Sequence, residues 1–250
     1  MATHSVQPNE AVTFAVAYEH EDVVVIEKRA GLVTQPGKGH EDDTLLNGLF
    51  ARWGNQLQQL GADRDYGLLH RLDRETSGLL VIALRGRAYD ALRKQFESRE
   101  VRKFYWAVCL KKPRTDTGVI DRPIAESTPK KLGEKKLSRI SGSGKAAQTA
   151  YRVLEATKKG CLIEARPLTG RLHQVRVHFD SIGSPILGDG LYAPGPIAAA
   201  APRLALHAHR LGFVHPVTGE AVDIKSKFPK DLRGVLVKLG LHRPDAESAA

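Results

Sequence analysis

The sequence predicts an α+β protein built around a large mixed or antiparallel sheet, and three features of its pattern predict this class. β-branched and apolar runs outnumber the segments with helical periodicity. The helical segments fall between those runs at irregular intervals, which is typical of α+β proteins. No internal repeat and no linker rich in Pro, Gly or Ser divides the 250 residues, so a single domain is expected.

Four segments in the first half of the chain carry clear patterns. Asp22 to Lys28 (DVVVIEK) is a β-branched run between charges, which predicts a strand. Apolar residues recur at helical spacing between residues 43 and 60, which predicts a helix with Asp43 as its cap. The apolar run 78–84 predicts a buried strand. Residues 87–99 place charges opposite an apolar face, so an amphipathic helix is expected there.

The second half adds strands and shorter helices. Its aromatic and β-branched composition predicts a strand over 103–110. Two further strands, over 149–156 and 161–166, are expected to join at a Lys-Lys-Gly turn. Helical character extends over 171–181 and is expected again over 229–239. The remaining expectations are a Pro-bounded Ala loop at 194–202, strands at 204–214 and 221–224, and a turn at 216–219.

The ends of the chain and one internal segment differ from this ordered pattern. Residues 1–20 are polar and are expected to form a tail or an edge segment, while 242–250 reads as a C-terminal tail. A single globular domain over 21–241 is expected between them. Within it, residues 111–147 hold ten Lys or Arg and four Asp or Glu, a local balance of +6. The composition predicts a basic loop or hairpin, which is either functional or a solvated insertion without a function.

The charge and composition of the whole chain narrow the possible partners. Lys and Arg number 38 against 28 Asp and Glu, a formal charge of +10 at pH 7, which favours a polyanionic partner such as nucleic acid. No apolar run is long enough to span a membrane, and the N-terminus lacks the pattern of a secretory signal. Only two cysteines occur, Cys109 and Cys161, which fits a reducing cytoplasm better than a disulfide framework.

Several common catalytic motifs are absent from the sequence. The Gly-Ser-Gly-Lys run at 142–145 fails the P-loop pattern at two positions. The ten histidines show no metal-ligand spacing and no H-E-x-x-H, so no metal site is expected. Neither the P-C-x-x-C of zinc deaminases nor the G-x-S-x-G of serine hydrolases occurs.

Two polar segments remain as candidates for chemistry. Residues 70–78, HRLDRETSG, place Asp73 between Arg71 and Arg74 immediately before a buried strand. Neighbouring cations favour an ionised carboxylate, although Asp73 is equally a residue that caps turns. Residues 166–178, RPLTGRLHQVRVH, carry a second basic cluster, either a functional face or a helix surface that pairs with acidic residues.

Together these segments resemble the RluA-type pseudouridine synthases. The family signature H-R-L-D-x-x-T-S-G is matched in full by residues 70–78. Four further motifs are similar in order along the chain. They are VVVIEKRAGLVTQPG at 23–37, where Glu27 and Arg29 replace the usual Asn and Pro, LTGRLHQVRVH at 168–178, GSPILGDGLY at 183–192, and RLALHAHRLGFVHPVTG at 203–219. The resemblance covers roughly residues 21–228.

The resemblance implies a fold, an activity and a catalytic set. The expected fold is a long, bent mixed sheet with flanking helices and a central RNA-binding cleft. The expected enzyme isomerises a uridine of ribosomal or transfer RNA to pseudouridine. Asp73 matches the catalytic aspartate of the family, and Tyr105 matches the tyrosine that packs on the target base. Arg176 matches the arginine that would pair with Asp73 and lower its pKa by ~1–3 units.

Further residues are expected to contact RNA. Arg71 is a candidate to fill the gap that the extruded base leaves, and Leu206 lies in the closing motif that supplies an apolar wall near Leu204. The other expected RNA contacts are polar or basic: Arg171, His173, Gln174, Lys130, Lys131, Lys135 and Lys136.

The chemistry needs a carboxylate beside the sugar, and neither a metal nor a redox cofactor is expected. Asp73 either attacks the anomeric carbon or removes the 2′ proton to give a glycal, and the sequence leaves both routes open. Extruding a stacked uracil costs a few kcal/mol, and stacking on an aromatic ring returns ~1–3 kcal/mol. This is the role expected for Tyr105.

Two other readings of the chain belong to different functional classes. A non-catalytic RNA-binding or chaperone protein would not need a carboxylate facing phosphates, and a nuclease would need clustered acids. A cytoplasmic monomer that requires no protein partner is expected. The choice between transfer RNA and ribosomal RNA stays open.

Overall fold

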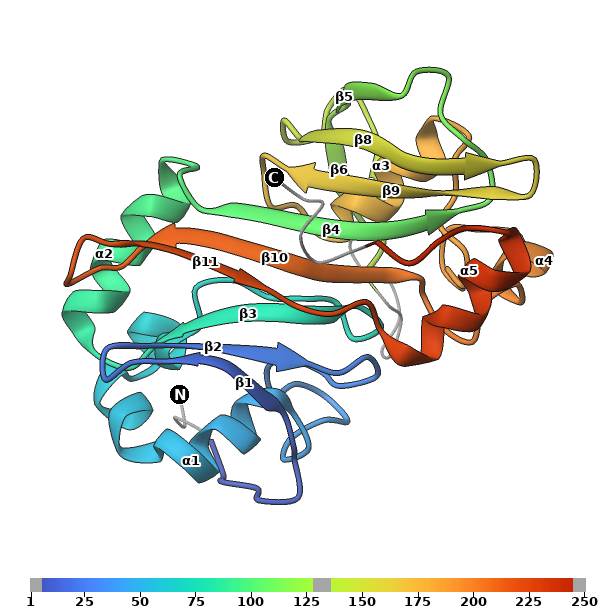
Figure 1. The fold of residues 1–250 in the computed structure, drawn as a ribbon. Coiled ribbons are helices and arrows are strands. Elements are labelled where there is room, and N and C mark those ends of the chain that lie inside the picture. The colour runs from blue at the N-terminus through green and yellow to red at the C-terminus, as the bar shows by residue number, and fades with distance from the viewer. Residues whose placement is uncertain (1–5, 128–135, 245–250) are drawn as a thin grey trace. The chain divides into compact units, whose positions relative to one another are not determined.

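The computed structural model describes residues 6–127 and 136–244, and the chain forms two compact units. The first unit contains Met1–Arg102 and Arg210–Ser226, and the second contains Lys103–His209 and Lys227–Ala250. Strand β10 (Leu206–Val214) contributes residues to both units. Figure 1 labels the elements of each unit in chain order.

The first strands of the first unit form an antiparallel sheet in chain order (Figure 1). In it, β2 (Val23–Lys28) pairs with β1 (Ala15–Glu19) on one side and with β3 (Ser77–Ala83) on the other. All seven residues of β3 are buried, as its unbroken apolar run predicted. The last strand, β11 (Ala221–Lys225), pairs with the part of β10 that starts at Arg210. The expected edge segment within residues 1–20 is therefore β1, which begins at Ala15.

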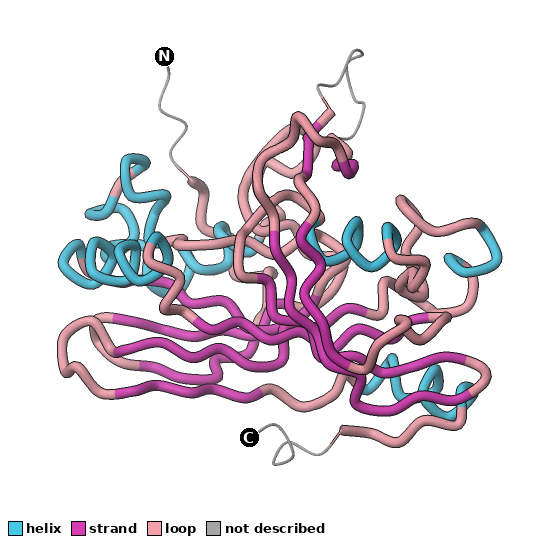
Figure 2. Tube along the Cα trace, turned by 90° about the horizontal axis from the view of Figure 1, so that it is seen from above, coloured by secondary structure: helices cyan, strands magenta, loops and turns pink. Residues whose placement is uncertain are grey.

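The helical segments of the first unit are α1 (Leu45–Leu60), the short 3-10 helix η1 (Ala62–Gly67) and α2 (Gly86–Glu97). They are seen at the left of Figure 2, on one side of the strands. Both predicted helices are confirmed, but the expected cap is wrong. Thr44 precedes α1, and its backbone N–H donates to Asn47 Oδ1 at 3.0 Å. Asp43 lies one residue too early, and its carboxylate contacts His40 Nδ1 at 2.9 Å instead.

The main strands of the second unit pair antiparallel in the order β4–β9–β8–β5. Their bounds are Arg102–Cys109 for β4, Gly160–Pro167 for β9, Gln148–Thr157 for β8 and Thr117–Asp121 for β5. A hairpin of β6 (Ile124–Glu126) and β7 (Ser138–Ile140) forms a second small sheet. The basic segment 111–147 thus contains the expected hairpin and, in addition, a strand of the main sheet.

Among the described residues of the second unit, the helices are α3 (Gln174–Ser181), the single turn α4 (Gly195–Ala198) and α5 (Arg233–Leu239), which follows the 3-10 turn η2 (Lys230–Leu232). The predicted helix at 171–181 starts three residues late, because His173 adopts a left-handed conformation with φ 53°. The loop expected at 194–202 is wrong in part. Pro196 lies in the first turn of α4, where a backbone N–H has no partner within the helix, so the proline leaves no hydrogen bond unmade and one turn of helix forms.

The α+β class is confirmed by these elements, and most of the predicted strands and helices occur within a few residues of their expected bounds. The predicted central cleft would join the two units and stays a prediction. Within the described residues, no helix is long and apolar enough to cross a membrane.

Candidate active site

The loop that carries Asp73 enters β3 in the first unit. Asp73 is half-buried, while Arg71 and Arg74 on either side are exposed. The backbone N–H of Thr76 donates to the Asp73 carbonyl at 3.1 Å, which closes the turn before the strand. At the other end of the loop, His70 Nε2 accepts the backbone N–H of Val81 at 3.2 Å. The carboxylate therefore lies on a short loop anchored at both ends to β3.

A second loop, between β2 and α1, holds the Asp73 loop through backbone oxygens. Lys28 is completely buried, and its ammonium donates to the carbonyls of Arg29 at 3.0 Å, Leu32 at 2.8 Å and Arg74 at 3.2 Å. The buried Thr34 hydroxyl donates to the Leu72 carbonyl at 2.8 Å. An ammonium has three donors, so one side chain ties both loops together.

One glycine in the β2–α1 loop meets a backbone requirement for this contact. Gly31 has φ +82°, a backbone conformation that is sterically unfavourable for residues with a Cβ atom. Its N–H donates to the Arg74 carbonyl at 2.8 Å, and Arg74 Nε donates back to the Gly31 carbonyl at 3.3 Å. The exposed Arg71 reaches Gln35 Oε1 of the same loop at 3.4 Å.

The second cluster of predicted residues precedes and begins α3 in the second unit. Gln174 is buried, and its side-chain oxygen accepts the hydroxyl of Thr169 at 2.7 Å and the backbone N–H of Arg171 at 3.1 Å. Its amide nitrogen donates to the Gln148 carbonyl at 2.9 Å and to the Thr149 hydroxyl at 3.0 Å. The oxygen and the nitrogen of the Gln174 side-chain amide both form hydrogen bonds within the protein, so Gln174 stabilises the shape of the loop before α3.

Arg176 lies on α3 and is 3% exposed. Its Nε and Nη2 donate to the two carboxylate oxygens of Asp189, at 2.9 and 2.7 Å. Burial raises the pKa of Asp189, but the hydrogen bonds and charge of Arg176 outweigh it and hold that pKa below its ordinary value. The pairing predicted from the resemblance, between Arg176 and Asp73, would join the two units and stays a prediction.

Tyr105 lies on β4 and is 8% exposed. Successive side chains alternate between the faces of a strand, so Tyr105 faces opposite to its neighbour Trp106. Trp106 stacks on His209 with ring centroids 3.9 Å apart and planes 4° from parallel. Leu206 of β10 is 3% exposed and lies in the same unit.

The basic residues expected to contact RNA are only partly covered. Lys130, Lys131 and Lys135 lie outside the described residues. Lys136 is exposed and lies two residues before the first residue of β7. Arg171 is half-buried, and its Nε donates to the Ala146 carbonyl at 3.1 Å. His173 Nδ1 lies 2.6 Å from the hydroxyl of Tyr192.

The structure brings the predicted residues together in two groups, one in each unit. Asp73 and Arg71 share the loop before β3, and Arg171, His173, Gln174 and Arg176 share the start of α3. Sequence reasoning missed the roles of Lys28, Thr34, Asp189 and Tyr192. All four lie in motifs that carry the resemblance, Lys28 and Thr34 at 23–37 and the other two at 183–192, but no role is predicted for any of them from the sequence.

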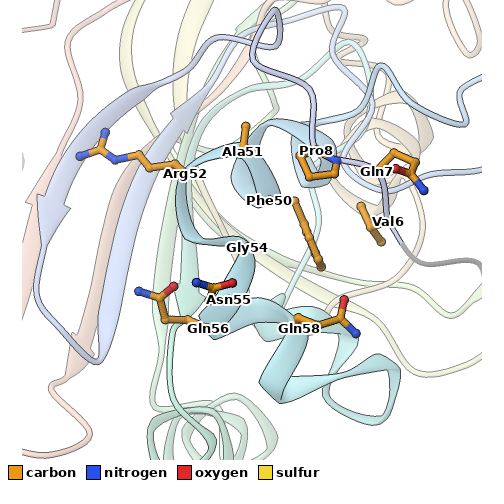
Figure 3. A pocket seen from close by; sticks show the side chains of 10 residues that line it. All are labelled: Val6, Gln7, Pro8, Phe50, Ala51, Arg52, Gly54, Asn55, Gln56 and Gln58. Atoms are coloured by element: carbon orange, nitrogen blue, oxygen red, sulfur yellow. The ribbon is translucent and has the colours of Figure 1, made fainter.

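The first unit also contains an open pocket between residues 6–8 and α1 (Figure 3). Amides and apolar groups dominate its lining, and Arg52 is the one ionisable side chain among the described residues that line it. Arg52 forms an ion pair with Glu19 at 2.8 Å. None of the predicted site residues lines this pocket. Within the part of the chain that the structure describes, no group of three or more His, Cys, Asp or Glu is arranged to hold a metal ion.

Comparison with known proteins gives one consistent result. A family model described as RNA pseudouridylate synthase matches residues 22–181. The chain is 37% identical over 230 residues to ribosomal large subunit pseudouridine synthase D of Zymomonas mobilis, covering 89% of this chain and 71% of that protein. It is 38% identical over 234 residues to the protein of the same name from Nitrosomonas europaea, covering 91% of this chain and 65% of the relative.

The fold is also similar to that of a solved human structure. Human RNA pseudouridylate synthase domain containing 4 matches with a TM-score of 0.70 and 27% identity, covering 92% of this chain and 95% of that one. The two bacterial relatives are longer than this chain, which spans about two thirds of their length.

Proposed function

The chain belongs to the RNA pseudouridylate synthase family, whose members are isomerases that act on RNA, and from this premise we propose that it converts a uridine of ribosomal RNA to pseudouridine. Ribosomal RNA is favoured because both relatives described above are named as modifiers of the large ribosomal subunit. The formal charge of +10 suits a polyanionic substrate.

Asp73 is the proposed catalytic group, and the single observation that carries this proposal is the way its loop is held. A carboxylate that must reach one sugar carbon needs a fixed backbone, because a misplacement of 1 Å can cost about a hundredfold in rate. Lys28, Thr34 and Gly31 supply that restraint through hydrogen bonds to the carbonyls of Leu72 and Arg74, the two neighbours of Asp73.

The reaction exchanges one bond of the sugar for another. The bond between C1′ and N1 of uracil breaks, the base turns, and C1′ bonds to C5, while the C5 proton is lost and N1 gains one. Ionised Asp73 either attacks C1′ or removes the 2′ proton, and both routes return the carboxylate at the end. We propose that Tyr105 stacks on the uracil while it is detached and that Arg176 pairs with Asp73 to keep it ionised.

RNA contact is proposed for the exposed or partly exposed basic residues. Arg71 lies beside Asp73 on the same loop, where it is suited to fill the gap left by an extruded base. Lys136, Arg171 and His173 are proposed to contact the RNA around the target nucleotide, and Leu206 to form an apolar wall. Lys130, Lys131 and Lys135 are proposed as phosphate contacts on the basis of their charge. We also propose that the enzyme is a monomer of the cytoplasm, where its two cysteines would stay reduced.

Release of tritium from C5 tests the activity directly. The purified protein is incubated with ribosomal and transfer RNA transcribed with [5-³H]uridine, because only isomerisation exchanges that hydrogen. We expect release from ribosomal RNA. Asp73→Asn should lower the rate at least about a thousandfold with RNA affinity within threefold, since the amide is neither nucleophile nor base. Asp42→Asn, the same change at an exposed position of the first unit, should leave the rate unchanged.

The alternatives give different results in the same assay. Release from transfer RNA alone would overturn the choice of ribosomal RNA but leave the reaction standing. Tight RNA binding without any release would support the non-catalytic binding protein. An Asp73→Asn variant at full speed would overturn the assignment of the catalytic aspartate.

A further inference from the structure

The buried ion pair between Arg176 and Asp189 is held in place by further contacts to each partner. Asp189 Oδ2 accepts Arg176 Nε at 2.9 Å, and Oδ1 accepts Nη2 at 2.7 Å. The same Oδ1 also accepts the backbone N–H groups of Leu191 at 3.0 Å and Tyr192 at 3.2 Å. The Asp189 side chain is 2% exposed. The two backbone N–H groups belong to its own loop, so they hold the carboxylate in place independently of Arg176.

Tyr192 restrains the same guanidinium from another direction. Its ring centroid lies 5.2 Å from Arg176 Cζ, within the range of a cation–π contact. Its hydroxyl accepts the backbone N–H of Ser138 at 2.8 Å and lies 2.6 Å from His173 Nδ1. His173 itself has a left-handed backbone with φ 53°, an unfavourable conformation for a residue with a side chain. Such strain persists only where surrounding contacts enforce it, and it clusters at functional sites.

We propose that Asp189 is a positioning residue for pseudouridine formation, which together with Tyr192 sets the plane and direction of the Arg176 guanidinium. The inference rests on the proposed function, because it gives Asp189 a role through Arg176. The side-on pair uses Nε and Nη2, so it fixes the guanidinium plane and turns Nη1 away from Asp189. The Tyr192 ring adds a contact that a shift of that plane would weaken.

The pair also sets the charge that Arg176 brings to the site. Arg176 and Asp189 together are neutral, so Arg176 acts mainly as a directed hydrogen-bond donor and only weakly as a net positive charge. Removing the charge of Asp189 leaves the buried guanidinium with its positive charge and without this partner. A carboxylate that faces this guanidinium would then ionise at lower pH.

Kinetics of Asp189→Asn separate positioning from simple support of the fold. With saturating enzyme and [5-³H]uridine-labelled ribosomal RNA, we expect the rate of the chemical step to fall about a hundredfold, because a directed donor is displaced by about 1 Å. The KM for RNA should stay within threefold. The acid limb of the pH–rate profile should move to lower pH, which loss of folded protein alone would not cause.

Two further variants show whether Asp189 acts through Arg176. Arg176→Gln should lower the rate strongly, and adding Asp189→Asn to it should lower the rate by less than twofold more, because the residue that Asp189 positions is already gone. Asp231→Asn is the matched control. Asp231 binds Arg203 side-on in the same unit, at 2.6 and 3.1 Å, and its variant should keep the wild-type rate and profile.

Tyr192→Phe keeps the test decisive if Asp189→Asn does not fold. It keeps the ring beside Arg176 and removes the hydroxyl, with its contacts to Ser138 and His173. We expect a rate about fivefold lower at unchanged KM, the effect of about one hydrogen bond. Wild-type protein that releases no tritium overturns the proposed function and this inference with it. Active wild type with a folded Asp189→Asn variant at full rate, or with a Tyr192→Phe variant at full rate where Asp189→Asn is unfolded, overturns the inference alone.

Discussion

The two groups of proposed catalytic residues are held by different chemistry. In the first unit, the Asp73 loop is restrained through backbone carbonyls, which receive the ammonium of Lys28 and the hydroxyl of Thr34. In the second unit, Arg176 is restrained by a carboxylate, Asp189, that backbone N–H groups hold in turn.

The difference has consequences for what each contact contributes. The three carbonyls around Lys28 belong to two separate loops. Removing the ammonium therefore releases the backbone of both loops and lowers the free energy of unfolding. The Arg176–Asp189 pair restrains one side chain, so disturbing it changes the direction of a donor and the local charge. We therefore expect variants of the first unit to affect unfolding most, and variants of the second to affect the chemical step and its pH dependence most.

Replacing Lys28 with Met gives the largest expected effect on stability. The buried Leu32 carbonyl and the partly buried Arg29 carbonyl each lose a charged donor, whereas the Arg74 carbonyl keeps the N–H of Gly31. A buried unsatisfied group costs about 1–3 kcal/mol, so we expect a loss of about 3 kcal/mol. For a chain of this size that lowers Tm by about 6–12 °C.

Scanning calorimetry measures this change, and Lys94→Met provides the control. Lys94 is exposed on α2, and its replacement should leave Tm within about 1 °C of wild type. Equal Tm values for the two variants would show that the loops are docked by other contacts and would remove the contrast between the units.

A smaller change in the same loop separates docking from folding. Thr34→Val keeps the shape of the side chain and removes the donor to the Leu72 carbonyl, next to Asp73. We expect a loss of about 1–2 kcal/mol in the free energy of unfolding and a rate of isomerisation about tenfold lower, with RNA affinity within twofold. Thr13→Val, at an exposed position of the first unit, should change neither quantity. A Thr34→Val variant with full activity would mean that Asp73 does not depend on this loop.

These contacts also mark the limit of what the sequence predicts. Periodicity correctly predicted α1, α2 and the buried strands β2 and β3, because each depends on residues close together in the chain. Lys28 looked like the charged end of a strand, and its most distant partner, the Arg74 carbonyl, lies 46 residues away. No local pattern indicates that a terminal lysine turns inward to carbonyls of two loops.

The second unit shows the same limit at a side chain. The resemblance predicts a role for Arg176 and includes the motif that contains Asp189, but it does not predict that the two residues form an ion pair. The partners are 13 residues apart, one on a helix and one on a loop, and the side-on geometry of the pair depends on how that loop folds. Gln174 is expected to contact RNA as part of the motif at 168–178, whereas the four hydrogen bonds of its side chain described above lie inside the protein. A polar residue type does not reveal whether its partner is substrate or backbone.

Lowering the pH should reduce the free energy of unfolding through buried histidines of both units, more through His207 than through His215. Burial, followed by the charges of His209 and Arg203, lowers the pKa of His207 to about 3. The unfolded chain titrates near 6.5, so between pH 6.5 and 3 the unfolded state binds one more proton and stability falls as pH falls. His207→Phe should reduce the slope of unfolding free energy against pH by up to ~1.4 kcal/mol per pH unit in that range.

His215 of the first unit gives the comparison for this measurement. Burial and His20 also lower the pKa of His215, but the charges of Asp22 and Glu220 oppose the shift. His215→Asn should therefore reduce the slope less than His207→Phe in denaturant titrations from pH 4 to 7. Equal slopes for the wild type and His207→Phe would show that His207 is not held neutral by its burial.

The smallest expected effect concerns the β6–β7 hairpin, where charge reversal should change affinity and leave the chemical step alone. Lys136, two residues before β7, and Arg139, within β7, are both exposed, and replacing both with Glu removes two cations. If both contact phosphates of single-stranded RNA, the slope of log affinity against log salt should become shallower by at least about 1.4. The rate at saturating RNA should stay within twofold. Lys158 and Lys159, exposed at the β8–β9 turn, provide a matched pair whose reversal should leave the slope unchanged. Equal changes from both pairs would mean that RNA senses only the net charge of the second unit and that the hairpin is not a specific contact.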